Sequence, residues 1–213
     1  MTTQTVITPA HLVGAYTYEA FIALSEELYA QNRTTSDADS YNTEQILQYT
    51  RLNLQRISRL ERTTTLNPEL VEAASGVQER WIWMVLAESW CGDVAQNLPV
   101  IKQIADSGQD ISVRVLLRDK NPDIMDAYLT NGGRSIPKLI CLRASDLSEL
   151  GNWGPRPEVL QGLMLEWKAQ NLPFEEVAEK IHGWYAKDHS QQLQTEFLQL
   201  IKQWQKAGQT AVL

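Results

Sequence analysis

The chain has 213 residues, of which 43% are hydrophobic, enough for one large domain or for one domain with an extension. Its formal net charge of −7 at pH 7 argues against a general affinity for nucleic acid or anionic membranes. No apolar run approaches the roughly 20 residues that a membrane-spanning helix needs. The first residues lack the basic and apolar segments of a signal peptide, and two widely separated cysteines do not make a disulfide framework. We therefore expect a reduced, cytoplasmic protein without nucleic-acid or membrane partners.

Three helices are predicted before the first strand, after a dozen residues with little pattern. Apolar residues at helical spacing predict a helix over 17–32, and the polar stretch 33–40 is typical of a loop. Asn42, followed by Gln45, predicts the start of a second helix that ends near Glu61. Its expected apolar face consists of Ile46, Tyr49, Leu54, Ile57 and Leu60. A short helix over 68–74 then leads to the first strand.

Arginines gather on one side of the second predicted helix. Arg51, Arg59 and Arg62 share this side, and Arg56 is nearby. Such a row can bind an anion or an acidic partner, or it can be the solvated face of a surface helix. We favour the solvated face.

A single cysteine follows the first predicted strand. The run 81–87 has no charge, is rich in β-forming residues and is too short for a buried helix, so it predicts a strand covered on both faces. Helical spacing begins at Asp93, which places Cys91 at a strand-to-helix corner. Free N–H groups and the helix dipole stabilise a thiolate at such a corner. Alternatively, a lone cysteine such as Cys91 can be a small hydrophobic residue that packs in the core and takes no part in catalysis.

The remaining pattern completes an α/β fold. Strands are expected over 111–116 and 138–142, with a helix over 122–128 between them and a last strand or hairpin arm over 147–153. This order predicts a mixed sheet with helices on both faces. Beyond the break at 154–157, three helices are expected on the same core. Their ranges are about 157–168, 174–187 and 190–205.

Four motifs resemble the thioredoxin family. Trp90-Cys91-Gly92-Asp93-Val94 resembles the active-site segment Trp-Cys-Gly-Pro-Cys, and Pro99 stands at the position of the family's helix proline. Asp119-Lys120-Asn121-Pro122 is similar to the family's Asp-x-Asn-Pro turn, and 132–139 is similar to Gly-x-Arg-x-Ile-Pro-Thr-Leu. The Trp-Cys-Gly-Asp variant, the preceding helices and the segment 184–188 also resemble bacterial thioredoxin-like proteins with helical extensions.

The resemblance implies a fold class and a division of the chain. We expect a thioredoxin-like mixed sheet with helices on both faces and with helical extensions at both ends. The expected division is an N-terminal helical extension (1–78) packed on the core, a thioredoxin-like core (79–153) and C-terminal helices of the same domain (154–213).

The resemblance also implies site residues. Cys91 matches the nucleophile, and the family's resolving cysteine is replaced by Val94. Val85 stands where thioredoxins bury an aspartate. Pro137 matches a cis-proline, and the backbone of Ile136 is then expected to face the substrate. The expected substrate groove consists of Trp90, Gly92, Asp93, Val94, Ile136 and Pro137.

The second cysteine and the nearby charged residues affect what Cys91 is expected to do. Cys141 lies about 13 Å beyond Pro137 on a predicted strand, whereas a disulfide needs Cα atoms within about 7 Å, so we expect Cys141 in the core. Glu88 and Asp93 would raise the pKa of the Cys91 thiol and the helix terminus would lower it, which leaves the net direction open. The three histidines are scattered without zinc-ligand spacing, so no metal is expected.

Two functions remain open from the sequence. In the first, Cys91 attacks a disulfide, sulfenate or glutathionylated partner, either a protein or a small molecule. Glutathione or another small thiol then resolves the product, and no other cofactor is expected. In the second, the protein is a thioredoxin-like binding module that recognises a protein or peptide partner without turnover.

Overall fold

The structure is a computed structural model, which describes residues 6–210 and the side chains of residues 6–208. Its sheet has four strands in the order β2-β1-β3-β4. Their bounds are β1 (Trp81–Ala87), β2 (Ile111–Leu117), β3 (Lys138–Arg143) and β4 (Glu149–Trp153). Strand β1 is parallel to β2 and antiparallel to β3, which is antiparallel to β4. The predicted α/β class and mixed sheet are confirmed.

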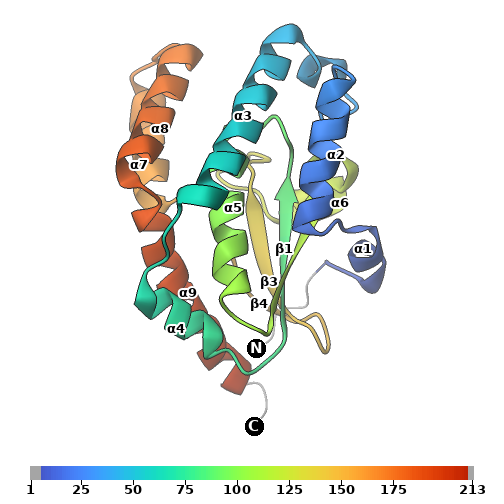
Figure 1. Cartoon of the computed structure of the whole chain (residues 1–213), viewed down its shortest axis with the longest axis vertical. Helices are drawn as coiled ribbons and strands as arrows, with labels where there is room; N and C mark the ends of the chain where they lie inside the picture. Colours follow the sequence, from blue (N-terminus) through green and yellow to red (C-terminus); the bar gives the residue numbers. More distant parts are fainter. Residues whose placement is uncertain (1–5, 211–213) are drawn as a thin grey trace.

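Helices cover both faces of this sheet (Figure 1). On one side lie α4 (Pro68–Ser75), α5 (Gly92–Asp106) and α9 (Gln191–Thr210). On the other lie α1 (Pro9–Gly14), which begins with a proline, and α6 (Pro122–Ala127). Strand β1 is buried at every position but Ile82, as expected for a strand covered on both faces. Helix α1 falls where the sequence shows little pattern, because a six-residue helix has too few turns for a periodic signal.

Helices α2 (Tyr18–Ala30) and α3 (Glu44–Thr63) precede the sheet, with the short 3₁₀ helix η1 (Asp39–Tyr41) between them. The predicted cap of α3 was wrong: Thr43, and not Asn42, accepts the bond from Ile46 N–H. Asn42 instead holds the preceding loop through bonds to Thr34, Ser36 and Ala38.

The buried side of α3 is more polar than the sequence pattern predicts. Its buried residues are Thr50, Asn53 and Ile57, of which only Ile57 belongs to the expected apolar face. Thr50 satisfies its hydroxyl within the helix by donating to the carbonyl of Ile46. Asn53 makes a contact outside the helix, described below, and this contact is the reason that a polar residue is buried there.

The C-terminal helices divide into a hairpin and a core helix. Helices α7 (Glu158–Ala169) and α8 (Phe174–Asp188) pack on each other, and α9 returns to the sheet. Figure 1 shows α3 and α8 extending past the N-terminal end of α5 on either side.

Aromatic side chains fix α9 to the sheet. Trp83 of β1 contacts Phe197 and Trp204 of α9, with ring centroids 5.3 and 6.1 Å apart. Trp153 of β4 contacts Phe197 at 5.3 Å. These edge-to-face contacts are favourable for aromatic rings. A Cβ atom at Gly151 would lie 2.2 Å from the indole nitrogen of Trp204, so only glycine fits under this helix.

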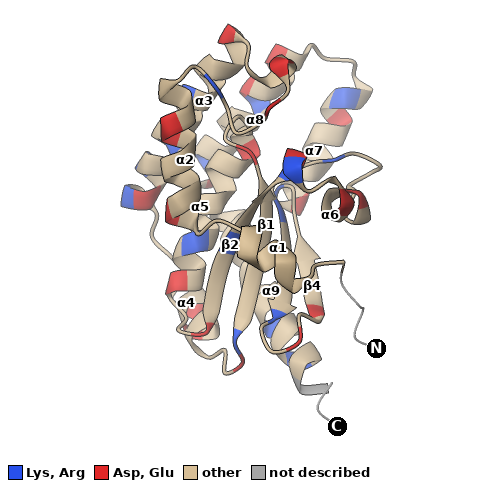
Figure 2. Ribbon diagram, turned by 90° about the vertical axis from the view of Figure 1, so that its right-hand side faces the viewer, with Lys and Arg blue, Asp and Glu red and all other residues tan. Residues whose placement is uncertain are grey.

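Charged residues lie mainly on the helices around the sheet (Figure 2). Among residues 6–210, no helix combines the length and apolar character needed to cross a membrane.

Candidate functional site

The site is built where β1 ends and α5 begins. Cys91 is the N-cap residue of α5 and is half-buried. Because β1 and β3 are antiparallel neighbours, with Leu86 opposite Lys138, the end of β1 lies beside the residues that precede β3. The Cys91 thiol accordingly donates to the carbonyl oxygen of Ile136 at 3.3 Å. The peptide bond between Ile136 and Pro137 is cis.

The groove residues expected from the sequence lie together here but differ in exposure. Trp90 and Gly92 are half-buried, like Cys91 itself. The other four are buried, namely Asp93, Val94, Ile136 and Pro137. Of the seven expected site residues, only those of the segment 90–92 are therefore partly exposed to solvent.

Trp90 is held by an aromatic and a cationic side chain. Its ring stacks on Tyr41, with centroids 4.2 Å apart and planes inclined by 12°. The Arg118 guanidinium lies 4.7 Å from the Trp90 ring centre and 5.3 Å from that of Tyr41. Aromatic stacking and cation–π contacts of this kind are both attractive interactions. Tyr41, from the loop before α3, therefore forms one wall beside Cys91, which the sequence pattern did not predict.

Asp93 is buried in a polar network with the C-terminal part of the chain. Its carboxylate accepts from Nη2 of Arg156 at 2.5 Å and from the Tyr185 hydroxyl at 2.7 Å. Asn97, one turn further along α5, donates to the Tyr185 oxygen at 2.8 Å. Burial alone would lower the pKa of Arg156, but Asp93 raises it overall. Burial and then the charge of Asp93 raise the pKa of Tyr185 well above its ordinary value.

The environment of Cys91 opposes ionisation. Burial, and after it the negative charge of Asp93, raises the pKa of the Cys91 thiol to about 12. The N–H groups of Val94 and Asp93 and the charge of Arg156 act in the opposite direction but are outweighed. The thiolate stabilisation expected at a helix N-terminus is therefore overcome by desolvation. At neutral pH the thiol is protonated.

Helices α3 and α8 meet the site at Gly92. A Cβ atom there would lie 3.0 Å from Cε1 of His182 and 4.0 Å from Oδ1 of Asn53. Asn53 donates to the carbonyl of Ser89 at 3.1 Å and accepts from Nη1 of Arg56 at 2.8 Å. Burial, and then the charge of Arg56, lowers the pKa of His182 to about 4.

Two sequence interpretations change at this point. His182, one of the three histidines that are scattered in the sequence, lies against the active-site segment. Arg56 is half-buried, so the solvated face predicted for the arginines of α3 does not extend to it. Arg51, Arg59 and Arg62 are exposed as predicted.

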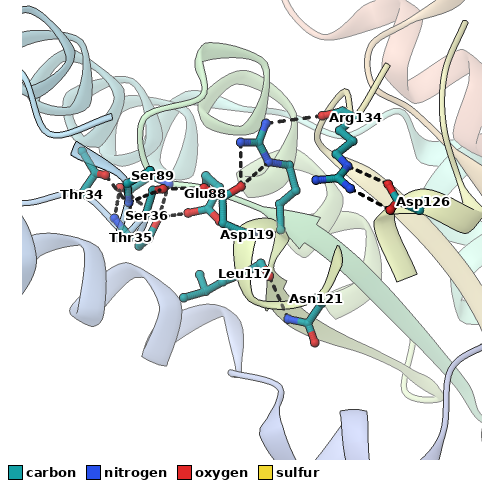
Figure 3. Close-up of polar contacts among 12 residues, drawn as sticks. Thr34, Thr35, Ser36, Glu88, Ser89, Leu117, Asp119, Asn121, Asp126 and Arg134 are labelled. Carbon is teal, nitrogen blue, oxygen red and sulfur yellow. Dashed lines mark hydrogen bonds and ion pairs between the residues drawn. The ribbon is translucent and has the colours of Figure 1, made fainter. Parts of the chain in front are cut away.

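A third network fixes the loop that carries Tyr41 (Figure 3). Glu88, fully buried at the end of β1, accepts from the hydroxyl of Thr35 and, at 3.0 Å, from the backbone N–H of Asp119. Ser36 donates to the Asp119 carboxylate at 2.5 Å. Arg118 binds the same carboxylate at 2.7 Å. Burial raises the pKa of Glu88 to about 7.

These bonds explain why part of a polar loop is buried. Residues 34–36 are almost inaccessible to solvent, although their sequence is typical of an exposed loop. The Thr35 hydroxyl donates to the buried Glu88 and the Ser36 hydroxyl donates to the more exposed Asp119, while the Thr34 hydroxyl accepts from the Ser36 N–H. Each of these polar groups therefore has a partner.

Comparison with known proteins identifies the family. A family model described as Thioredoxin matches residues 40–172. The chain belongs to the thioredoxin family. The match extends beyond 79–153, where the sequence motifs lie, and includes α3 and α7.

Two solved structures have the same fold at low sequence identity. An HIV epitope-scaffold is 16% identical, with a TM-score of 0.57, covering 92% of this chain and 98% of the other. A protein of unknown function from Pseudomonas aeruginosa is 15% identical, with a TM-score of 0.52, covering 88% of this chain and 98% of the other. No curated protein matches.

Two further positions considered in the sequence analysis, Cys141 and Val85, lie in the core. Cys141 is fully buried on β3 opposite Trp83, as predicted. Its thiol is free, as is that of Cys91. Val85 is fully buried on β1, opposite Leu139. Within the residues that the structure describes, no three His, Cys, Asp or Glu side chains gather as metal ligands would.

Proposed function

We propose that this thioredoxin-family protein performs thiol–disulfide exchange with Cys91 as its single active-site thiol. The observation that carries the proposal is the position of the Cys91 sulfur, at the first turn of α5 and 3.3 Å from the Ile136 carbonyl. A sulfur placed there can meet a disulfide that approaches along the backbone before Pro137. Position 94, one turn further on, is a buried valine and cannot release the product.

The reaction then needs an external thiol. Cys91 loses its proton to solvent, and its thiolate attacks one sulfur of the substrate disulfide. A new S–S bond forms to Cys91 as the old one breaks, and the leaving thiolate takes up a proton. A second, external thiolate attacks the substrate sulfur of the mixed disulfide and forms a new S–S bond with it, and Cys91 leaves as a thiolate that takes up a proton. Trp90 and the Ile136 backbone would form the groove, with buried Asp93, Val94 and Pro137 supporting it beside Gly92.

The buried surroundings of the Cys91 sulfur favour a second function, that of a binding module without turnover. A thiol with a pKa of about 12 is ionised in only about one molecule in 10⁵ at pH 7. The half-buried surface at Trp90 and Gly92 would then serve recognition alone. A reduced cytoplasmic compartment suits either function, because it keeps Cys91 free.

Mass spectrometry of the intact, folded protein separates the two. We expect incubation with glutathione disulfide to add one glutathione to the wild type and none to Cys91→Ser, and added thiol to remove it. The rate should increase about tenfold per pH unit from about pH 7 to 10, because the thiolate fraction does so below the pKa. A folded wild type that gains no adduct at any of these pH values would leave only the binding module.

A further inference from the structure

We propose that Arg56 and His182 form a binding site for the carboxylate of a small thiol or disulfide, so that Cys91 reacts preferentially with small anionic disulfides such as glutathione disulfide. The inference rests on the proposed exchange reaction. It adds the class of molecule that the site selects.

Arg56 is a half-buried cation without a counter-charge. Its guanidinium donates to the neutral amide oxygen of Asn53, and no carboxylate among residues 6–208 pairs with it. Of the other arginines that are not exposed, Arg118, Arg143 and Arg156 each have a carboxylate partner. Among the described residues, Arg114 has none, as is the case for Arg56. An arginine has five N–H donors in a planar fork that fits a carboxylate. Arg56 uses one of these for Asn53 and keeps the others for an external group.

His182 and the amide that binds Arg56 both lie beside Gly92: a Cβ atom there would be 3.0 Å from Cε1 of His182 and 4.0 Å from Oδ1 of Asn53. The Nδ1 atom of His182 is buried and has no hydrogen-bond partner in the described part of the chain. Buried polar atoms are nearly always paired, so an unpaired one requires an explanation. Burial, and after it the charge of Arg56, lowers the pKa of His182, whereas the charge of Asp93 raises it. An anion between them would accept from Arg56 and, once His182 holds a proton on Nδ1, from His182 as well.

The position relative to Cys91 connects this pair to the reacting sulfur. Asn53, which holds Arg56, also binds the Ser89 carbonyl, two residues before Cys91. His182 lies against Gly92, the next residue after Cys91. Helices α3 and α8, which carry Arg56 and His182, extend past this end of α5 (Figure 1). The two backbone carboxylates of glutathione lie at opposite ends of the tripeptide, several bonds from its sulfur, so that one can bind at a distance from the reacting atom.

The chemical step is the first half of the exchange. The Cys91 thiolate attacks one sulfur of glutathione disulfide, a protein–glutathione S–S bond forms, and the glutathione S–S bond breaks. One glutathione leaves as a thiolate and takes a proton from water. Cys91 is oxidised and the departing glutathione is reduced, so no other oxidant is needed.

The test compares three disulfides of different charge on the folded full-length protein. Glutathione disulfide is anionic, hydroxyethyl disulfide is neutral and cystamine is cationic. Rates of adduct formation at Cys91 are measured by mass spectrometry for the wild type, Arg56→Gln and Arg114→Gln. Arg114 is the matched control, since it is half-buried on β2 and bonds only to the Val113 carbonyl among the described residues.

We expect Arg56→Gln to react at least tenfold more slowly with glutathione disulfide, and within twofold of the wild type with hydroxyethyl disulfide. Arg114→Gln should change neither rate. Glutathione disulfide should also raise the pKa of His182, observed by NMR, in the wild type but not in Arg56→Gln. An equal loss with all three disulfides, or none with any, would overturn the carboxylate site while leaving the exchange reaction intact. Failure of the wild type to react with any of them would instead refute the proposed function.

Discussion

Two buried carboxylates flank Cys91, and their surroundings differ. Asp93 faces the C-terminal helices and has a cationic partner, Arg156, together with the Tyr185 hydroxyl. Glu88 faces the N-terminal loop and is bound by a neutral hydroxyl and a backbone N–H. The first carboxylate is therefore paired with a cation beside the thiol, whereas burial raises the pKa of the second to about 7. Asp93, which is bound by the C-terminal helices, therefore determines the charge next to Cys91. Glu88, which is bound by the N-terminal loop, is the carboxylate expected to change its protonation near neutral pH.

The largest expected effect comes from breaking the Asp93–Arg156 pair. Asp93→Ala leaves the Arg156 guanidinium buried without its counter-charge, which should lower the free energy of unfolding by about 3–5 kcal/mol. The matched control is Asp126→Ala, which removes the exposed Asp126–Arg134 pair and should cost far less, because water screens both charges. Urea denaturation at pH 7 measures both. Equal losses in the two variants would contradict the role assigned to the Asp93 network.

The second expected effect is a pH dependence of the free energy of unfolding that comes from Glu88. Because its folded-state pKa is about 7, the native protein binds a proton at Glu88 more tightly than the unfolded chain does. Glu88 therefore makes its full contribution to the free energy of unfolding below about pH 4.5. This contribution is lost as the pH rises towards 7, which lowers the free energy of unfolding by up to about 3 kcal/mol. Glu88→Gln keeps the shape and cannot ionise, so its unfolding free energy should lack this decrease. A wild type and variant with parallel stability curves from about pH 4.5 to 8 would refute the assignment.

A third effect concerns the thiol itself. Asp93→Asn removes the second-largest cause of the raised Cys91 pKa, so the pKa should fall while burial keeps it above the ordinary value. Alkylation by iodoacetamide at pH 8 should be about tenfold faster for each unit of this fall. Glu88→Gln should leave the alkylation rate within about twofold. A reversed order of the two variants would show that Glu88, and not Asp93, sets the charge at the sulfur.

The smallest expected effect tests the N-terminal wall. Tyr41→Leu keeps an apolar side chain but removes the stack on Trp90, whose centroid is 4.2 Å away, at a cost of about 0.5–1.5 kcal/mol. The intrinsic fluorescence of the variant should also change, because Trp90 becomes more exposed to solvent. An unchanged stability and spectrum would mean that Tyr41 does not hold Trp90 in solution.

The sheet could be predicted well from the sequence because its signals are local. The uncharged run 81–87 and the motifs around Cys91 and Pro137 each fix a short segment, and β1, β3 and the start of α5 follow from them. Cys141 was placed correctly in the core because strand length alone carries it away from Pro137. The apolar stripe of α9, with Phe197 and Trp204, likewise follows from helical spacing.

The polar surroundings of the site could not be predicted in the same way. Arg156 lies in a Gly-Pro-rich break and Tyr185 in a helix with few buried residues, so no periodicity marks either of them as a partner of Asp93. Asn53 and Arg56 lie on a helix whose polar residues are typical of a solvated face. Their pairing depends on contacts between segments far apart in the chain, which local patterns do not contain. Only the family-like segment 184–188 pointed towards Tyr185.

The most direct test asks whether Val94 alone limits Cys91 to a single-thiol site. Position 94 lies one turn into α5 on the same face as Cys91, and Val94→Cys is nearly volume-neutral, so the fold should lose less than about 1.5 kcal/mol. Intact-mass measurement after mild oxidation should show an intramolecular disulfide between Cys91 and the introduced thiol in this variant, reversible by thiols, and no intramolecular disulfide in the wild type. A folded variant that forms no such disulfide, or a wild type that links Cys91 to Cys141, would contradict the placement of Cys91 as a thioredoxin-type nucleophile.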